Sequence, residues 1–559
     1  MEKRFFLALV LTALVLIVLP RLYSGVSRQR QPARGPQASQ DSDRRGGASS
    51  AADSVRPSSI DSARLPPTAL PVQGRGRADT VSVRTDLARF VFSSVDATLL
   101  DIELTRFRSL ARAGRAVQLA RDSMPLLQYR LVAGTDTIPF ALGTMRRDST
   151  GAVGDSLRVR YSGTVGPAVV WIEYRVLPDD YVIRVAGGVT GVSGIPVRLL
   201  VELPPGIRSE EADSVEDHRY LAVAHKPAVG DAERVSFDDL DPGQQLVEPD
   251  KLTWVVVKNK YFLVGVLRPE GKAPFEGLRM VGGPRTSRSA TTVYTTLVEP
   301  ITDGGFEFEV YAGPQEYRRL LAMGRDFHNA NPYGGWLQGV VQPFATIVMQ
   351  ILLWMRETFK LNYGWVLVIF GVGIRILMWP LYQSSMRASL RMQRIQPEIM
   401  EAQRRYQNNP QKQQAEMLRI YREHGMTPFS PLMGCLPALI PMPVLIALFF
   451  VFQNTIEFRG VSFLWLPDIS LKDPYYIVPL VMGGSMFLLS WIGMRNAPPN
   501  PQAKIVAYFL PIMMTVFFLN FASGLNLYYA VQNIAALPQQ WMIAHERAKA
   551  ATKPGQSRT

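Results

Sequence analysis

The chain has 559 residues, of which 47% are hydrophobic, and a formal net charge of +14 at pH 7. This length exceeds one ordinary domain, and long apolar blocks in the C-terminal third indicate a membrane protein with a large water-soluble part. The single cysteine, Cys435, excludes an intrachain disulfide, and the histidines include no i, i+4 pair, so no metal site is predicted. There is no phosphate-binding loop and no nucleic-acid-binding motif, so neither a nucleotide cofactor nor a nucleic-acid substrate is expected.

The N-terminal segment 1–21 is predicted to be a membrane anchor. Its apolar run "FFLALVLTALVLIVLP" follows Lys3 and Arg4, which is also typical of a cleaved signal peptide. Because the run is long and no A-x-A cleavage site follows, we expect an uncleaved anchor. The next segment, 22–79, is rich in Arg, Ser, Gln, Pro and Gly and predicts a disordered linker.

Residues 80–320 are expected to form a large all-β sandwich outside the membrane. Runs such as "DSLRVRYSG", "VVWIEYRVLPDDYVIRVAG", "KLTWVVVKNKYFLVGVL" and "GFEFEVYAG" alternate apolar and polar residues with a period of two. The carboxylate pairs Asp179-Asp180 and Glu210-Glu211 occur at turn-like positions. We interpret them as solvated turn residues rather than a catalytic pair, so no enzyme activity is predicted.

Segment 334–360 is predicted to be an amphipathic helix on the membrane surface. Gln338, Gln342, Thr346 and Gln350 recur every four residues and form a polar stripe along one face of a helix. A continuous polar stripe favours an interfacial helix over a span.

The core, 362–545, is predicted to contain five spans, which with the anchor make six. Five apolar segments support this count: 362–381, 430–455, 475–493, 505–520 and 523–543. Loop 381–428 carries eight basic and four acidic residues, and the tail 546–559 is also basic, whereas loop 456–474 is not positive. Because positive loops stay in the cytoplasm, both termini should be cytoplasmic and the β domain external.

The cytoplasmic loop itself is predicted to be a helical hairpin, 383–425, with its turn at "NNP", 408–410. Its basic side chains and methionines are the candidate contact residues for a partner, since methionine adapts to varied apolar surfaces. In the alternative interpretation, the methionines only hold the two helices together. The candidate residues are Met386, Arg387, Met392, Arg394, Met400 and Met417.

An arginine inside the first core span is the main functional signal. Arg375 lies in "GVGIRILMWPLY", where a charge costs about 2.5–3.5 kcal/mol on insertion scales. No Asp or Glu lies in the middle of any predicted span, but neutral polar residues occur near the last one. An arginine among neutral polar groups predicts a hydrated, positively charged groove in the membrane. The other groove candidates are Asn520, Asn526, Tyr528, Tyr529, Gln532 and Asn533.

The order of these segments, with "GIRILMWPL", "SPLMGCLPALIPMPVLIALFFVF", "DPYYIVPLVMG" and "LPIMMTVFFLNFASGLNLYYAVQNI", resembles the YidC membrane-protein insertase family over roughly 80–545. The resemblance implies that Arg375 is the groove arginine, that Tyr529 contacts the client, and that the hairpin is needed for function. Gly371 stands where some relatives have Thr, one turn before the arginine. The resemblance further implies that the β domain is a mutarotase-type supersandwich without a catalytic role.

The implied function is insertion and folding of nascent proteins in the bacterial inner membrane without nucleotide hydrolysis. The implied partners are nascent membrane-protein clients, the lipid bilayer and the Sec translocon, with the ribosome as a further candidate. Two alternatives stay open from the residues. One is a small-anion transporter that uses Arg375, although the spans show no inverted repeat. The other is a membrane-anchored carbohydrate-binding module that acts through the β domain.

Overall fold

The computed structural model describes residues 79–551, except for 123, 144, 155, 193, 286–289, 332–337, 381–382, 384–394, 396, 426–441 and 496–500. The chain divides into two compact units, with the boundary between Gly335 and Trp336. The predictions for the anchor, for the linker up to 78 and for the end of the tail lie outside the described residues. So do those for Met386, Arg387, Met392 and Arg394.

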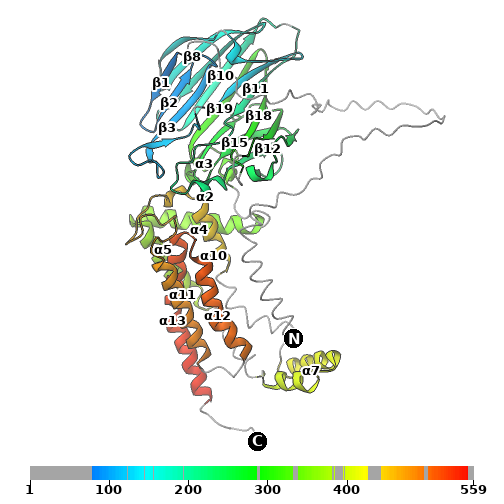
Figure 1. Cartoon of the computed structure of the whole chain (residues 1–559), viewed down its shortest axis with the longest axis vertical. Helices are drawn as coiled ribbons and strands as arrows, with labels where there is room; N and C mark the ends of the chain where they lie inside the picture. The colour runs from blue at the N-terminus through cyan, green and yellow to red at the C-terminus, as the bar shows by residue number, and fades with distance from the viewer. Residues whose placement is uncertain are drawn as a thin grey trace, which may run out of the picture. The chain divides into compact units, whose positions relative to one another are not determined.

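The first unit is built from antiparallel strands, as the period-2 alternation predicted (Figure 1). They form a four-stranded sheet in the order β1-β2-β3-β4, a nine-stranded sheet in the order β13-β12-β15-β16-β19-β10-β9-β8-β7, and a six-stranded sheet in the order β14-β17-β18-β11-β5-β6. The strands are β1 (Thr80–Arg84), β2 (Ala88–Ser93), β3 (Thr98–Arg108), β4 (Ala116–Gln118), β5 (Gln128–Ala133), β6 (Asp136–Pro139), β7 (Arg146–Val153), β8 (Ser156–Val165), β9 (Ala168–Val176), β10 (Val182–Thr190), β11 (Val197–Leu203), β12 (Ala222–Pro227), β13 (Glu233–Ser236), β14 (Gln245–Glu248), β15 (Leu252–Lys258), β16 (Phe262–Leu267), β17 (Gly277–Gly282), β18 (Val293–Pro300) and β19 (Gly305–Pro314).

The core of this unit is aromatic and aliphatic, with a few polar groups that are hydrogen-bonded inside it. The hydroxyl of Tyr174 donates to the carbonyl of Ala97 at 2.6 Å and lies 2.9 Å from the hydroxyl of Tyr129, and both rings are buried. Short helices α2 (Ser214–His218) and α3 (Tyr317–Ala322) complete the unit. The indole of Trp254 donates to the carbonyl of Arg325, which ties the segment after α3 to the central strands.

The interpretation of Glu210-Glu211 as solvated turn residues was wrong. Both side chains are buried, and Glu210 forms an ion pair with Arg112, which is 98 residues away in the sequence. Burial of a carboxylate is tolerated when it is paired and hydrogen-bonded, as it is here. Asp180 is also paired, with Arg319 at 2.9 Å. Glu210 and Asp180 therefore provide structural contacts, whereas Asp179 is exposed, as expected for a solvated turn residue.

The second unit consists of helices whose apolar composition follows the predicted segments. Helix α4 is bent by 119° relative to α5 across a short break, and in Figure 1 it lies across the direction of α11 and α13. Helix α5 packs on α13, α13 also packs on α11 and α10, and α11 packs on α12. The helices are α4 (Gln338–Phe359), α5 (Tyr363–Leu377), α7 (Pro410–Glu423), α10 (Met442–Asn454), α11 (Ile477–Met494), α12 (Pro501–Phe518) and α13 (Ser523–Ala551).

Helix α4 has three distinct faces. One is buried and includes Ala345, Val348 and Leu352; α4 packs on α10. A second carries the predicted polar stripe, in which Gln350 is exposed. The third is an exposed apolar stripe, whose residues lie within an arc of about 80° around the helix axis when each residue turns by about 100°. It is formed by Phe344, Ile347, Ile351 and Trp354.

The loop between α10 and α11 is organised by two buried aspartates. Asp468 accepts hydrogen bonds from the backbone of Gly460 at 2.8 Å and Ser470 at 2.8 Å. Asp473 accepts from the backbone of Val478 at 2.7 Å and satisfies a donor at the start of α11. Both carboxylates are thus part of the fold and contribute little to the charge exposed by this loop.

Among the described residues, one helix, Ile477–Met494, is long and apolar enough to cross a membrane. The bent pair 342–359 and 363–377 passes this test only as a unit, and Lys504–Phe518 is apolar but shorter. The six-span count is therefore not confirmed. Part of the reason is that the anchor and residues 430–441 of the predicted third span lie outside the described residues.

Candidate functional site

The candidate site is centred on Arg375, in the last turn of α5, where a cation is favoured by the helix dipole. The α5 helix is positioned by Asn362, whose side chain caps its N-terminus and donates to the carbonyl of Ser462 at 2.9 Å. Arg375 is partly exposed as a residue, although its Nε is buried, and its Nη2 donates to Oε1 of Gln539 at 2.7 Å. Gln539 is 1% exposed. The arginine therefore reaches across to α13 and contacts a neutral amide there.

A second contact joins the same two helices one turn earlier in α5. Nε2 of Gln532 donates to the carbonyl of Gly371 at 2.8 Å and to the hydroxyl of Tyr528 at 3.1 Å. A Cβ at Gly371 would lie 3.1 Å from the side chain of Val531, so the missing side chain allows α5 and α13 to approach closely. Small residues and interhelical hydrogen bonds are the usual means by which helices associate in lipid.

The polar residues of α13 are divided between two faces. At 100° per residue, Tyr528, Gln532 and Gln539 lie within about 40° of one another, towards α5. The buried residues Asn526 and Asn533 lie about 130° away on average. Asn533 donates to the carbonyl of Met482 in α11 at 3.4 Å, and Asn526 donates to that of Phe518 at the end of α12 at 3.0 Å.

The predicted groove residues are thus not one cluster in this structure. Tyr528, Gln532, Asn526 and Asn533 are buried and form hydrogen bonds within the helical unit. Asn520 is exposed, and Tyr529 is partly exposed, with its ring 5.9 Å from that of Phe518. Gln539 was not among the predicted groove residues, although its spacing of seven residues from Gln532 places both on one helix face.

The helices expose large apolar side chains that lipid would cover. Such a surface is unusual for a protein surrounded by water. Exposed residues of this kind occur on α5, α11, α12 and α13. They include Trp365, Ile369, Ile376, Leu480, Phe487, Trp491, Ile505, Phe509, Ile512, Val516, Ile534 and Trp541.

The described part of the hairpin has a small core of its own. Its buried residues are Ile395, Ile399, Ala402 and Ile420, and Met417 packs against them. The turn is as predicted, since Asn409 caps α7 and accepts from the backbone of Lys412 at 3.1 Å. Met417 therefore contributes to packing between the two helices, whereas Met400 is partly exposed.

Arg419 of α7 forms ion pairs with two glutamates of the same helix. The neighbouring carboxylates of Glu416 and Glu423 raise the pKa of Arg419, through a hydrogen bond and direct attraction. Their spacings, i, i+3 and i, i+4, are typical of helix-stabilising pairs on a solvated face.

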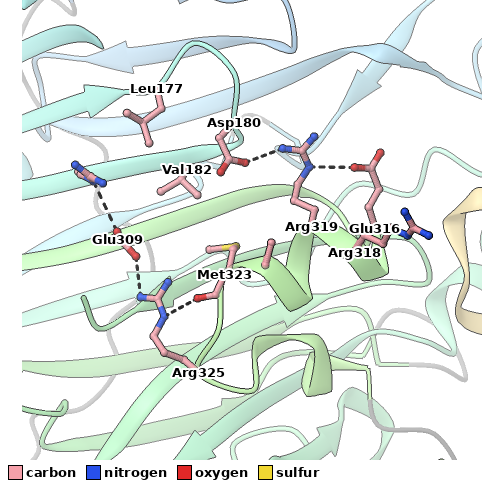
Figure 2. A pocket seen from close by; sticks show the side chains of 11 residues that line it. Leu177, Asp180, Val182, Glu309, Glu316, Arg318, Arg319, Met323 and Arg325 are labelled. Carbon is pink, nitrogen blue, oxygen red and sulfur yellow. Dashed lines mark hydrogen bonds and ion pairs between the residues drawn. The ribbon is translucent and has the colours of Figure 1, made fainter. Parts of the chain in front are cut away.

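A polar pocket of about 520 Å³ lies in the β unit, next to α3 (Figure 2). Its charged lining is paired: Arg319 contacts Asp180 and Glu316, and Arg325 contacts Glu309 at 2.7 Å. The lining residues include no aromatic ring on which a sugar could stack and no histidine. The pocket therefore gives no specific support to a carbohydrate-binding function.

The sandwich unit, the lipid-compatible helices and the partly exposed arginine define a membrane protein with a large water-soluble β domain. Two family models match it: "60Kd inner membrane protein" over residues 354–550 and "YidC periplasmic domain" over 80–347. The membrane protein insertase YidC of Chlorobaculum tepidum is 29% identical over 523 residues, covering 86% of both chains. That of Chlorobium phaeovibrioides is 30% identical over 500 residues, covering 84% of this chain and 83% of the relative. The chain therefore belongs to the YidC membrane protein insertase family, which confirms the resemblance.

These matches assign the helical unit to a family of inner-membrane proteins and the β unit to its periplasmic domain. A solved structure described as an active YidC insertase with its first transmembrane domain resolved also matches. It is 18% identical, covers 84% of this chain and 94% of the other, and has a TM-score of 0.34, too low to support an argument.

Proposed function

We propose that this chain inserts nascent proteins into the bacterial inner membrane through a hydrated, positively charged groove around Arg375, without nucleotide hydrolysis. Family membership supports the function as a whole, and the position of Arg375 supports the mechanism. Arg375 is partly exposed in the last turn of α5, and its guanidinium contacts the neutral amide of Gln539. Such a charge can attract an acidic or polar client segment and hold water within the membrane.

The energetic logic divides insertion into two steps. The polar end of a client enters the hydrated groove, where Arg375 lowers the free energy of a carboxylate. The apolar segment then leaves sideways and is buried in lipid, which supplies roughly 25 cal/mol per Å² of apolar surface. This driving force is large for a span of about 20 apolar residues, so no nucleotide is required.

The topology belongs to the same proposal. We place six spans in the membrane, both termini in the cytoplasm, the β domain in the periplasm and 334–360 on the external surface. The three-faced arrangement of α4 and its 119° bend from α5 support an interfacial position. In this arrangement the Sec translocon and the ribosome are candidate partners, and the hairpin 383–425 is a cytoplasmic contact surface.

The test compares two clients that differ only in the charge of their translocated ends. Arg375→Ala should impair the acidic client most, because its attraction to the groove is lost, while Arg375→Lys should retain much activity. Arg495→Ala is the matched control, since it removes an exposed cation at the end of α11. Equal loss for both clients, in parallel with loss of protein abundance, would instead identify Arg375 as a structural residue.

The carbohydrate alternative has a separate test. Deletion of most of 80–320 should leave insertion intact if the function lies in the helical unit. Loss of all activity with normal abundance of the truncated chain would move the function to the β domain.

A further inference from the structure

Three side chains that could bind a metal converge at one edge of the β domain. They are His225 on β12, Glu233 on β13 and Glu248 on β14. One ring nitrogen of His225 and one carboxylate oxygen of each glutamate all lie within 4.8 Å of one another. No metal site was predicted from the sequence, because these residues are not regularly spaced along the chain.

The fold explains the convergence. His225 and Glu233 are direct partners in the antiparallel pair β12–β13, so their side chains project from the same face of the nine-stranded sheet. Strand β13 is an edge strand of that sheet, and β14 is an edge strand of the six-stranded sheet. The cluster therefore lies where the edges of two different sheets meet.

The histidine lacks the contact that burial normally requires. His225 is 1% exposed, and its Nδ1 is buried without a hydrogen-bond partner among the described residues. A buried polar atom without a partner is destabilising, and a bound ligand would satisfy it. Burial lowers the pKa of His225 to about 4, against an opposing effect of Asp250. The ring is therefore neutral near pH 7, which is the form that coordinates metals.

We propose that His225, Glu233 and Glu248 bind one divalent transition-metal cation, of the zinc class. This ion would link the nine-stranded and six-stranded sheets of the β domain. One imidazole and two carboxylates favour such an ion over calcium, which requires six to eight oxygen ligands. Tetrahedral bonds of about 2.0–2.1 Å place ligand atoms about 3.3 Å apart, so modest rotation of the glutamate side chains is needed. Water would supply the fourth ligand.

The experiment uses the full chain in detergent after removal of metals with a chelator. Zinc is titrated in competition with a chromophoric chelator, and bound zinc is counted by elemental analysis after desalting. We expect one saturable site that is lost in His225→Ala. In Glu233→Gln the affinity should fall by more than about tenfold, since second-shell changes alone typically cost 10- to 100-fold. His218→Ala is the matched control, because it removes a histidine of the same domain outside the cluster.

Glu233 is exposed, so its replacement by glutamine tests the site without disturbing the core. Zinc should raise the unfolding temperature of the β domain in the wild type and in His218→Ala, but not in Glu233→Gln. Cobalt should give the intense visible bands of a four-coordinate site in the same two proteins. Equal zinc affinity in the wild type and Glu233→Gln, or the absence of a saturable site in the folded wild type, would overturn the proposal.

Discussion

Replacing Gln539 by glutamate tests the role of the positive charge while leaving Arg375 in place. Oε1 of Gln539 already accepts from Nη2 of Arg375 at 2.7 Å, so a carboxylate there would form an ion pair without rearrangement. Glutamate and glutamine have nearly the same shape, and the net charge of the site would fall from +1 to zero. The variant should therefore remove the attraction for an acidic client and retain the packing of α5 on α13.

The size of the effect follows from Coulomb's law. At an effective dielectric constant of about 20, two unit charges attract by about 4 kcal/mol at 4 Å and about 2 kcal/mol at 8 Å. A client carboxylate held 8 Å from Arg375 would thus lose about 2 kcal/mol, which corresponds to a factor of about 30 in binding. A client with a neutral translocated end should change by less than a factor of about two.

The assay follows insertion of a single-span client into vesicles that contain the purified chain, by protection of the translocated end from protease. The acidic client and a version with Asn and Gln in place of its acids are compared at equal chain concentration. Gln540→Glu is the matched control, because it adds the same charge at the adjacent residue. The side chain of Gln540 lies towards Gly493 of α11. Gln539→Met removes the hydrogen bond without adding charge and should preserve the preference for the acidic client. The reasoning would be refuted if Gln539→Glu slowed both clients equally, or if Gln540→Glu had the same effect.

Three further outcomes are expected. Gly483→Ala should destabilise the helical unit by about 1–3 kcal/mol, because a Cβ there would lie 2.9 Å from Cβ of Thr515. Gly484→Ala, which meets nothing within 4 Å, should be neutral in the same thermal unfolding measurement. Burial raises the pKa of Asp96 from 3.8 to about 6, so between these values the folded state binds more protons and its stability increases as the pH falls. Asp96→Asn should remove the contribution of Asp96 to that dependence and stabilise the β domain at pH 7 by up to about 3 kcal/mol, which unfolding curves at pH 4.5 and 7 would check. Deletion of 384–424 should abolish insertion at unchanged protein abundance; normal insertion would make the hairpin only a linker.

The strands of the β domain could be predicted because their signal is local. The quoted segments correspond to β8, β9, β10, β15, β16 and β19; burial partly alternates along β8 and β9, whereas β15 and β16 are buried on both faces. The pairing of Glu210 with Arg112 could not be predicted, since it depends on how one loop folds back on the connection between β3 and β4, 98 residues earlier. Local composition around "EEAD" resembles a solvated turn whether or not such a partner exists.

In the helical unit the sequence indicated candidate residues but not how they are arranged. Arg375 was recognisable because a charge within an apolar run is costly. Its contact with Gln539 spans 164 residues and could be inferred only once α5 and α13 were known to pack together. The polar residues of α13 were predicted as one lining, whereas the structure distributes them over two helix faces.

Two positions on α5 differ in their surroundings: Gly371 is packed against α13, whereas Arg375 is partly exposed. At Gly371 the helix is buried against α13, and its carbonyl is occupied by Gln532. Four residues later, about 6 Å along the helix, Arg375 is partly exposed. The polar groups before this point hold helices together in a medium that provides no hydrophobic force between them. In the proposed mechanism, this partly exposed position would let the charge of Arg375 act on a client while its contact with Gln539 positions it.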